Sequence, residues 1–314
     1  MNTLNKLKDL WGTMLYHHAR RLYEKDPKLA ADSMFRRVYH RSMNLEQPQH
    51  LIEKITWLQL NSDTSLWTKC ADKLRAREYV EGCGLGDYLP KLYGHWDTTD
   101  EVDVSNLPNQ FVLKANNGCG TVKIVRDKSK LNMEELRKTM RKWLSRPFGY
   151  QACQAHYLRI KPCILAEELL PITGIQAELS PTSLMDYKIW CFQGQPENCL
   201  LVYNRGDGTK AITLDLYDTQ WNRLDDKIVS NRHYQVTKNT RVPKPDSWEE
   251  MLHIAETLSK PFPEVRVDLY EINGRPYIGE LTFTSGYGYF TEEYYNYLGS
   301  KIDLTKVKQI KQLD

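Results

Sequence analysis

The stretch from residue 265 to residue 283 constrains the fold more than any other part of this 314-residue chain. It contains Asn273-Gly274, a dipeptide that favours a tight turn between two antiparallel strands. Apolar side chains recur at alternate positions on both sides of the turn, at Val265, Val267, Leu269, Leu281 and Phe283. The pattern predicts a hairpin with one face in a hydrophobic core and a second, polar face.

The register of this hairpin decides whether two carboxylates meet. A strict two-residue turn would put Asp268 opposite Gly279 and point Glu280 to the other side of the sheet. One extra residue, in a three-residue loop or as a bulge, would put Asp268 opposite Glu280 and Arg266 opposite Thr282. Opposite side chains lie about 5 Å apart, close enough for two acids to hold two divalent ions roughly 3.5–4 Å apart. We predict this second register; the alternative is a surface hairpin with an incidental charge pair.

A second candidate is the sequence Lys-Ala-Asn-Asn-Gly-Cys-Gly from Lys114 to Gly120, between β-rich runs at 111–114 and 122–125. Gly118 and Gly120 permit backbone conformations that direct N–H groups at an anion. A Walker A loop has its lysine after the glycines and opens a helix, whereas here the lysine comes first and a strand follows. We interpret the segment as a flap over phosphates, although an ordinary glycine-rich hairpin would have the same pattern.

Two further segments carry candidate polar residues. Residues 164–170 predict a strand that bends at Pro171, where backbone groups and apolar side chains can hold a flat heterocycle. Asp72 and Lys73 fall in a helix predicted over Thr68–Glu81, together with Arg75 and Arg77. Such a charged run is usually a solvated helix face.

Charge is distributed unevenly along the chain. The net charge is +3, but residues 1–45 hold nine Lys and Arg against four acids, which leaves −2 for the rest. The body is therefore not a nucleic-acid binder by charge. An amphipathic helix is predicted at the N-terminus, with an apolar stripe that contains Leu4, Leu7, Trp11, Met14, Leu15 and Leu22. It could lie on an anionic membrane surface or dock on its own protein, and we favour the second interpretation.

Composition excludes several protein classes. An apolar fraction of 41% and a charged fraction of 26% exclude a disordered chain. The chain has no signal-peptide pattern and no apolar stretch near the ~20 residues of a membrane span. Seven cysteines without a CxxC pair predict free thiols in a reducing cytoplasm, with no zinc site and no disulfide framework.

Predicted helices come first along the chain. Three are expected before residue 61, and later ones at 132–144 and 247–259 alternate with strands at 163–167, 187–192, 199–203 and 211–217. This order favours an α+β fold. Tyrosines and a phenylalanine crowd residues 287–297, either beside a sugar site or as a C-terminal packing patch.

The motifs follow one another in a fixed order along the chain. They are Asp-Lys at 72–73, the lysine and glycine-rich loop at 114–120, Glu-Glu-Leu-Leu at 167–170, Arg-x-Asp at 266–268 and Glu-x-Thr at 280–282. This order resembles the ATP-grasp superfamily, and more narrowly the TupA-like ATP-grasp family named after teichuronopeptide biosynthesis. The resemblance runs from about residue 44 to residue 290. The segments that carry it are 44–45, 53–58, 71–73, 77–80, 107–108, 111–114, 166–168, 186–188, 265–270 and 279–284.

The resemblance implies an α+β fold in which two lobes clasp ATP behind a helical N-terminal region. The implied divisions are a helical N-terminal region at 1–66, a pre-grasp segment and glycine-loop lobe at 67–165, a hinge and metal-binding lobe at 166–300, and a tail at 301–314. The implied cofactors are ATP and Mg²⁺.

The resemblance also implies roles for individual residues. Lys73 and Lys114 would contact phosphates, Lys188 with Asp186 would face the nucleotide, and Arg266 with Lys114 would act on the transferring phosphoryl group. The loop over the phosphates would be Asn116, Asn117, Gly118, Cys119 and Gly120, and the adenine hinge Glu167, Glu168 and Leu169. The magnesium ligands would be Asp268 and Glu280, with Thr282 beside them.

Three positions depart from the expected pattern. Thr282 stands where the wider superfamily has Asn, as is usual in the TupA-like branch, and a hydroxyl is a weaker metal ligand than an amide. Asn117 and Cys119 replace an expected His and Ser, and Ser285 replaces an expected Pro. These changes could alter substrate fit without abolishing ATP binding.

The implied function is an ATP-dependent carboxylate–amine ligase that works through an acyl phosphate. Its substrates would be a uronic-acid-type sugar or glycan carboxylate and an amino-acid amine, in bacterial surface polysaccharide biosynthesis. The alternatives are a kinase that phosphorylates a glycan hydroxyl and a non-catalytic nucleotide-binding accessory protein. We expect no nucleic-acid partner, a cytoplasmic location, and a possible peripheral membrane contact through residues 1–45.

Overall fold

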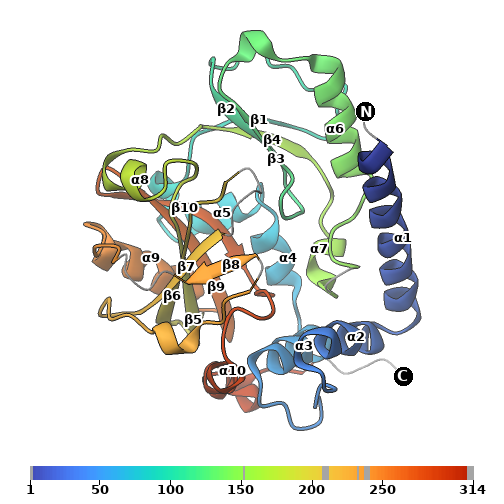
Figure 1. Ribbon diagram of the computed structural model, residues 1–314, viewed down its shortest axis with the longest axis vertical. Coiled ribbons are helices and arrows are strands. Elements are labelled where there is room, and N and C mark those ends of the chain that lie inside the picture. Colours follow the sequence, from blue (N-terminus) through green and yellow to red (C-terminus); the bar gives the residue numbers. More distant parts are fainter. Residues whose placement is uncertain (1–2, 151–152, 207–211, 232, 237–240, 310–314) are drawn as a thin grey trace.

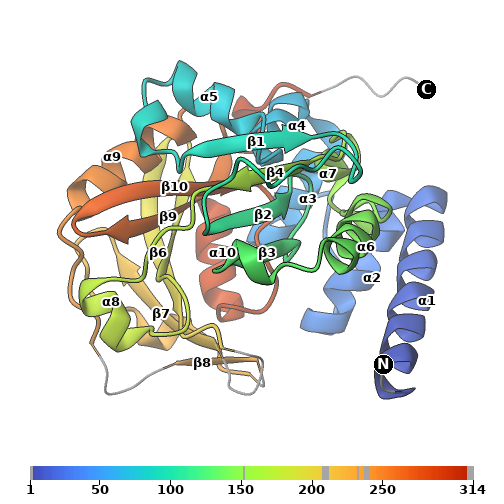
Figure 2. The same ribbon diagram turned by 90° about the horizontal axis from the view of Figure 1, so that it is seen from above.

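The computed structural model describes residues 3–150, 153–206, 212–231, 233–236 and 241–309. Helices come first and two β-sheets follow (Figures 1 and 2). This confirms the α+β prediction. Ala211, where a strand was expected to begin, and the last five residues of the predicted tail lie outside the described residues.

Three helices form the N-terminal region: α1 (Thr3–Lys25), α2 (Pro27–Tyr39) and α3 (Leu51–Asn61). Pro27 starts α2, where its missing N–H costs nothing, and the Asp26 carboxylate accepts a hydrogen bond from the Leu29 N–H. His50 and Glu53 form a capping box at the start of α3. Figures 1 and 2 both show α1 along one edge of the molecule.

The helix predicted over Thr68–Glu81 is broken into α4 (Ser65–Ala71) and α5 (Ala76–Gly82). Asp72 is buried, and its Oδ1 accepts hydrogen bonds from the N–H groups of Leu74 and Arg75 at 2.9 and 3.3 Å. The Lys73 N–H donates to the Asn116 carbonyl at 3.1 Å. The prediction of one helix with a solvated charged face was therefore wrong, because these bonds divert the backbone at Asp72.

The smaller sheet has four antiparallel strands in the order β1, β4, β2, β3. They are β1 (Leu92–Trp96), β2 (Phe111–Ala115), β3 (Val122–Val125) and β4 (Ile164–Glu167). Helix α6 (Met133–Leu144) packs Leu136 and Met140 into the core on one face of this sheet. The Asn132 side chain caps α6 by accepting hydrogen bonds from the N–H groups of Glu134 and Glu135.

The larger sheet has six strands in the order β10, β9, β5, β6, β7, β8. They are β5 (Asp186–Phe192), β6 (Gln195–Tyr203), β7 (Ile212–Asp218), β8 (Tyr234–Val236), β9 (Glu264–Ile272) and β10 (Arg275–Thr282). Helix α9 (Trp248–Ser259) packs on β5, β6 and β9. Ser247, at the N-cap of α9, makes no side-chain capping bond and donates its hydroxyl to Glu271 at 2.6 Å.

The remaining described elements are short. They are the helices α7 (Ala155–Leu158), α8 (Gly174–Leu179) and α10 (Glu292–Ser300), and 3₁₀ turns at Gly86–Tyr88, Lys128–Lys130, Asp225–Lys227 and Leu304–Lys306. Phe290, Tyr294 and Tyr295 are buried, and Tyr287 and Tyr289 pack against the core. Most of the aromatic run is therefore a packing patch, as one of the two interpretations expected.

All seven cysteines are free thiols, as predicted. None of the helices in the described part of the chain has the length and apolar character to cross a bilayer.

Candidate active site

The hairpin of β9 and β10 has the predicted register. Asn273 and Gly274 both have positive φ, at 52° and 75°, as a tight two-residue turn requires. Near the turn Leu269 pairs with Ile278. The next residue of β10 has no partner, and after it Asp268 pairs with Glu280 and Arg266 with Thr282. A bulge, rather than a longer loop, thus brings the two acids together.

Gly279 is the extra residue, and its lack of a side chain matters. A Cβ at this position would lie 2.9 Å from the Tyr270 ring and 3.1 Å from the Asp268 carbonyl oxygen. Both distances are shorter than ordinary contacts. A glycine is therefore needed where the strand bulges directly beside the paired acids.

Asp268 is buried within a set of charged and polar groups on one face of the larger sheet. Arg266 donates to both Asp268 oxygens, at 2.6 and 2.8 Å, and to the Thr282 hydroxyl at 3.1 Å. Lys188 on β5 lies opposite Asp268 and contacts it, and also contacts Asp186 at 2.8 Å. Burial alone would lower the pKa of Arg266, but Asp268 outweighs it and raises that pKa.

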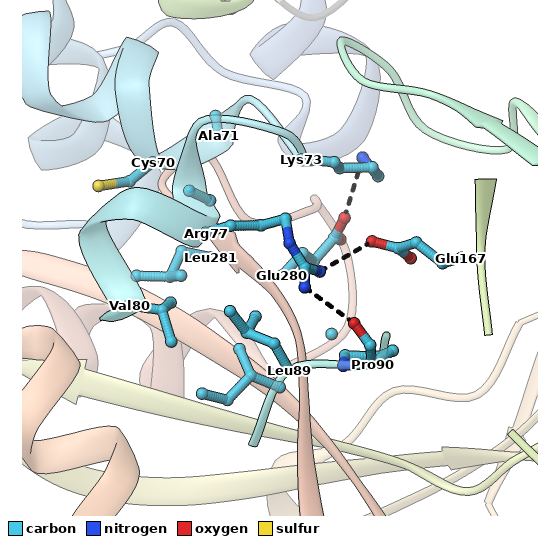
Figure 3. Close-up of a pocket in the computed structure, with 13 residues that line it drawn as sticks. Cys70, Ala71, Lys73, Arg77, Val80, Leu89, Pro90, Glu167, Glu280 and Leu281 are labelled. Carbon is cyan, nitrogen blue, oxygen red and sulfur yellow. Dashed lines mark hydrogen bonds and ion pairs between the residues drawn. The ribbon is translucent and has the colours of Figure 1, made fainter. Parts of the chain in front are cut away.

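Glu280 links this cluster to the glycine-rich loop. The Lys73 ammonium lies 3.2 Å from Glu280 and donates to the Gly118 carbonyl at 2.8 Å (Figure 3 shows the contact with Glu280). Burial would raise the pKa of Glu280, but Lys73, Lys188 and Arg266 lower it to about 2. Lys73 therefore joins the loop of the smaller sheet to the acids of the larger sheet.

Glu167, at the end of β4, forms a second charged group. It accepts from Lys114 on the neighbouring strand β2 and from Arg77 at 3.4 Å. Arg77 also donates to the Pro90 carbonyl at 2.9 Å (Figure 3). Glu167, Arg77, Lys73 and Glu280 line one pocket with about 20 Å³ of free volume, room for about one water molecule.

The loop residues divide into anchors and an exposed tip. The Asn116 side chain donates to Asp72 at 2.9 Å and to the Lys161 carbonyl at 3.0 Å, and accepts from the Cys163 N–H at 2.8 Å. Asn117 and Gly118 are also buried, whereas Cys119 and Gly120 are exposed. Asn116 thus holds the loop in place, and any effect of its side chain on a ligand is indirect.

At the predicted hinge, Glu168 is tied to the start of β1. Its N–H donates to the Lys91 carbonyl at 2.9 Å, and its carboxylate accepts from the Lys91 N–H at 3.3 Å. Leu169 is half-buried next to it. The hinge backbone is therefore fixed against β1 on one side.

Some residues at the site were not predicted. Val122 and Ile124 are exposed apolar side chains of β3, and their pairing puts them on the same face as Lys114 and Glu167. These two apolar residues alternate with Lys123 in the sequence, and this pattern could have predicted that they lie on one face of the strand. Arg77 was placed on a solvated face, and Arg205, which contacts Asp186 at 2.7 Å, had no local signal at all.

The acids of the hairpin offer carboxylate oxygens, which are ligands that Mg²⁺ accepts. Within the residues that the structure describes, no group of three or more His, Cys, Asp or Glu side chains could hold a metal ion. Magnesium, however, is often held by one or two carboxylates together with substrate phosphates and water. Asp268 and Glu280, with the Thr282 hydroxyl, fit an ion of that kind, which arrives with a nucleotide.

The sequence matches the model of the TupA-like ATP-grasp family over residues 53–303. The chain belongs to the TupA-like ATP-grasp family. This confirms the resemblance given by the motifs, and the match begins within α3 and ends after α10. It thus includes both sheets of this ATP-grasp protein.

Several solved structures are similar to this ATP-grasp chain. D-alanine–D-alanine ligase from Bacillus anthracis is 15% identical with a TM-score of 0.44, over 72% of this chain and 60% of the ligase. L-amino acid ligase from Bacillus licheniformis is 13% identical with a TM-score of 0.45, over 85% of this chain and 55% of the ligase. The match thus spans about 60% of the length of the first ligase. A comparison with curated proteins finds no match.

Proposed function

We propose that this protein is an ATP-dependent carboxylate–amine ligase that forms an amide through an acyl phosphate. The main support is the meeting of both charge signs at the bulged hairpin. Asp268 and Glu280 lie there with Arg266, Lys188 and Lys73. A metal ion needs the acids, whereas nucleotide phosphates need the cations, so this mixture suits a magnesium–nucleotide complex.

The nucleotide would lie between the two sheets. Adenine would pack against Val122 and Ile124 and meet the backbone of residues 167–169. The phosphates would lie beneath the loop of Asn116, Asn117, Gly118, Cys119 and Gly120, near Lys114, Lys73 and Lys188. In that arrangement the phosphates replace Glu167 and Glu280 as partners of the two lysines Lys114 and Lys73.

The reaction would take place in two steps. A substrate carboxylate oxygen attacks the γ-phosphorus of ATP, the bond to the β,γ-bridging oxygen breaks, and ADP leaves. The substrate amine then attacks the acyl carbon, phosphate leaves, and the nitrogen loses a proton to solvent. Arg266 and Lys114 would stabilise negative charge on the transferring phosphoryl group. Mg²⁺ held by Asp268 and Glu280, with Thr282, would neutralise phosphate charge when bound.

For the substrates we propose a uronic-acid-type sugar carboxylate and an amino-acid amine, in the synthesis of bacterial surface polysaccharide. Membership of the TupA-like family supports this class. Arg205 supports the carboxylate part of this proposal, because its side chain is partly exposed while Asp186 holds it in place at 2.7 Å. A guanidinium placed in this way can bind a carboxylate in two parallel hydrogen bonds.

The test is to incubate the full chain with ATP, Mg²⁺, mixed amino acids and either glucuronic or galacturonic acid. Nucleotides are then separated to distinguish ADP from AMP, and products are weighed by mass spectrometry. We expect ADP, free phosphate and a product with the mass of an amide. Phosphate retained on the sugar would identify a kinase instead, and ATP binding without turnover under any substrate pair would identify an accessory protein.

A further inference from the structure

Helix α1 presents an unpartnered apolar stripe to solvent. Trp11, Met14 and Leu15 are 64%, 60% and 42% exposed. Their spacing of three and four residues puts them on one face of the helix. Three large apolar side chains on adjacent turns of one helix form a continuous patch, which a single exposed residue does not.

The helix is attached to the body through a different face. Tyr16 and Tyr23 pack edge-on against Tyr150, with ring centroids 5.9 and 5.5 Å apart. Arg146 donates to the Thr13 hydroxyl at 2.7 Å. The expectation that the helix docks on its own protein is thus confirmed, but its attachment does not use the exposed part of the stripe.

Among the stripe residues whose side chains the structure describes, Leu22 at its C-terminal end reaches the body. Leu22 packs against the small cluster of Ala30, Ala31 and Cys153. The side chains of Leu4 and Leu7 lie outside those that the structure describes. Attachment by the aromatic face therefore leaves Trp11, Met14 and Leu15 available for another surface.

A groove of about 250 Å³ continues the stripe between α1 and α2. Apolar side chains form most of its lining, and His18 and Arg37 supply its ionisable groups; the lining also includes Leu15, Leu22, Ala30 and Met34. Arg21, Lys25, Lys28 and Arg37 are exposed on the same two helices. Apolar and cationic groups therefore occur together over α1 and α2.

We propose that the α1–α2 surface, defined by Trp11, Met14, Leu15, Arg21 and Arg37, docks this protein on an anionic lipid bilayer. The three apolar side chains would enter the boundary between headgroups and acyl chains, while the cations would contact the headgroups. The charge of residues 1–45, +5 against −2 elsewhere, favours an anionic surface over a neutral one. This proposal does not depend on the proposed ligase activity.

The test is flotation of the full chain with vesicles of phosphatidylcholine alone or with about 30% phosphatidylglycerol. We expect at least tenfold more bound protein on the anionic vesicles, and loss of most binding between about 0.1 and 1 M NaCl, because salt screens the attraction. Trp11→Gln with Met14→Gln should lower vesicle binding roughly tenfold, and Arg21→Gln with Arg37→Gln should remove the preference for anionic lipid.

The matched control is Ile175→Gln, which changes an exposed apolar residue on α8, on the side of the molecule away from α1 (Figures 1 and 2). It should bind vesicles like the natural chain. Circular dichroism verifies that every variant is folded. Absence of vesicle binding, or binding that the Trp11 and Met14 variant retains, would overturn the proposal. The proposal would also be overturned if the protein did not bind vesicles and instead formed a concentration-dependent dimer that the Trp11 and Met14 variant disrupts. A second copy of the chain would then cover the α1–α2 surface.

Discussion

Asp268 and Glu280 lie opposite each other, yet their surroundings differ enough to separate activity from stability. The Asp268 side chain is 2% exposed between Arg266 and Lys188, whereas the Glu280 side chain is 33% exposed and contacts Lys73. Removing one partner of a buried ion pair typically costs about 3–5 kcal/mol, because the remaining charge is left uncompensated. The Glu280 pair with Lys73 is partly exposed, so water screens it more and its loss should cost less.

We therefore expect Glu280→Gln to lower turnover about a hundredfold or more and to reduce the free energy of unfolding by less than Asp268→Asn does. Asp268→Asn should lower turnover similarly and also destabilise the protein by about 3–5 kcal/mol. Urea denaturation measures the free energy of unfolding, and the rate of ADP formation measures turnover. Normal turnover in a folded Glu280→Gln protein would refute the proposed metal role of Glu280.

His156 gives a prediction about pH. It is fully buried beside the rings of Trp67, Tyr157 and Phe283. Burial is the main cause that lowers its pKa to about 3. Below pH 6.5 the unfolded chain takes up a proton at this histidine, but the folded chain does not. The free energy of unfolding should therefore fall as pH decreases from 6.5 towards 3, by about 2 kcal/mol at pH 5 from His156 alone.

The measurement is urea denaturation at pH 7 and pH 5 for the natural chain and for His156→Phe, which suits the aromatic surroundings. The variant should lose about 2 kcal/mol less between the two pH values. His50, whose pKa burial lowers to about 4, remains in both proteins and cancels in the comparison. Equal losses in the two proteins would mean that His156 is protonated in the fold.

Among the structural elements, the β9–β10 hairpin is predicted by a local sequence pattern and also carries the paired acids of the candidate active site. Gly279→Ala would introduce a methyl group beside the Tyr270 ring and the Asp268 carbonyl. The strand would have to shift where Asp268 and Glu280 pair, so we expect at least a tenfold loss of turnover. Gly274→Ala is the matched control, because its positive φ costs about 1 kcal/mol of stability but lies at the turn, away from the acids. Equal turnover in the two variants would contradict a role for the bulge.

The hairpin and the glycine-rich loop could be predicted because their signals are local. Asn273-Gly274 sets the turn, and alternation of apolar residues sets the faces. The sequence alone left the bulge open between two registers, and the proposed chemistry decided the choice. The break between α4 and α5 depends on local bonds to Asp72 and also on a bond from Lys73 to Asn116, 43 positions along the chain, and the sequence gives no sign of this second bond. Arg77 and Arg205 were missed for the same reason: their partners, Glu167 and Asp186, are distant in sequence.

In the whole molecule, charged contacts join the two sheets, whose hydrophobic cores are separate. Lys73 contacts Gly118 on the loop of the smaller sheet and Glu280 on the larger sheet. A ligand that binds both groups would therefore stabilise the two sheets together. Because the acids need a cation and the lysines need an anion, neither Mg²⁺ nor ATP alone satisfies the whole set of charges.

This reasoning gives a prediction for thermal unfolding. A non-hydrolysable ATP analogue with Mg²⁺, at about a hundred times its dissociation constant, adds about 2.7 kcal/mol of stability. We expect the melting temperature to rise by about 5 °C, measured by differential scanning fluorimetry. Mg²⁺ alone should have little effect, and the analogue with EDTA should give less than half of the shift. Glu280→Gln should reduce the magnesium-dependent part only, whereas Lys73→Met should also reduce the shift seen with EDTA. An equal shift with and without Mg²⁺ would show that Asp268 and Glu280 do not hold an ion with the nucleotide, and would leave the lysines as its main contacts.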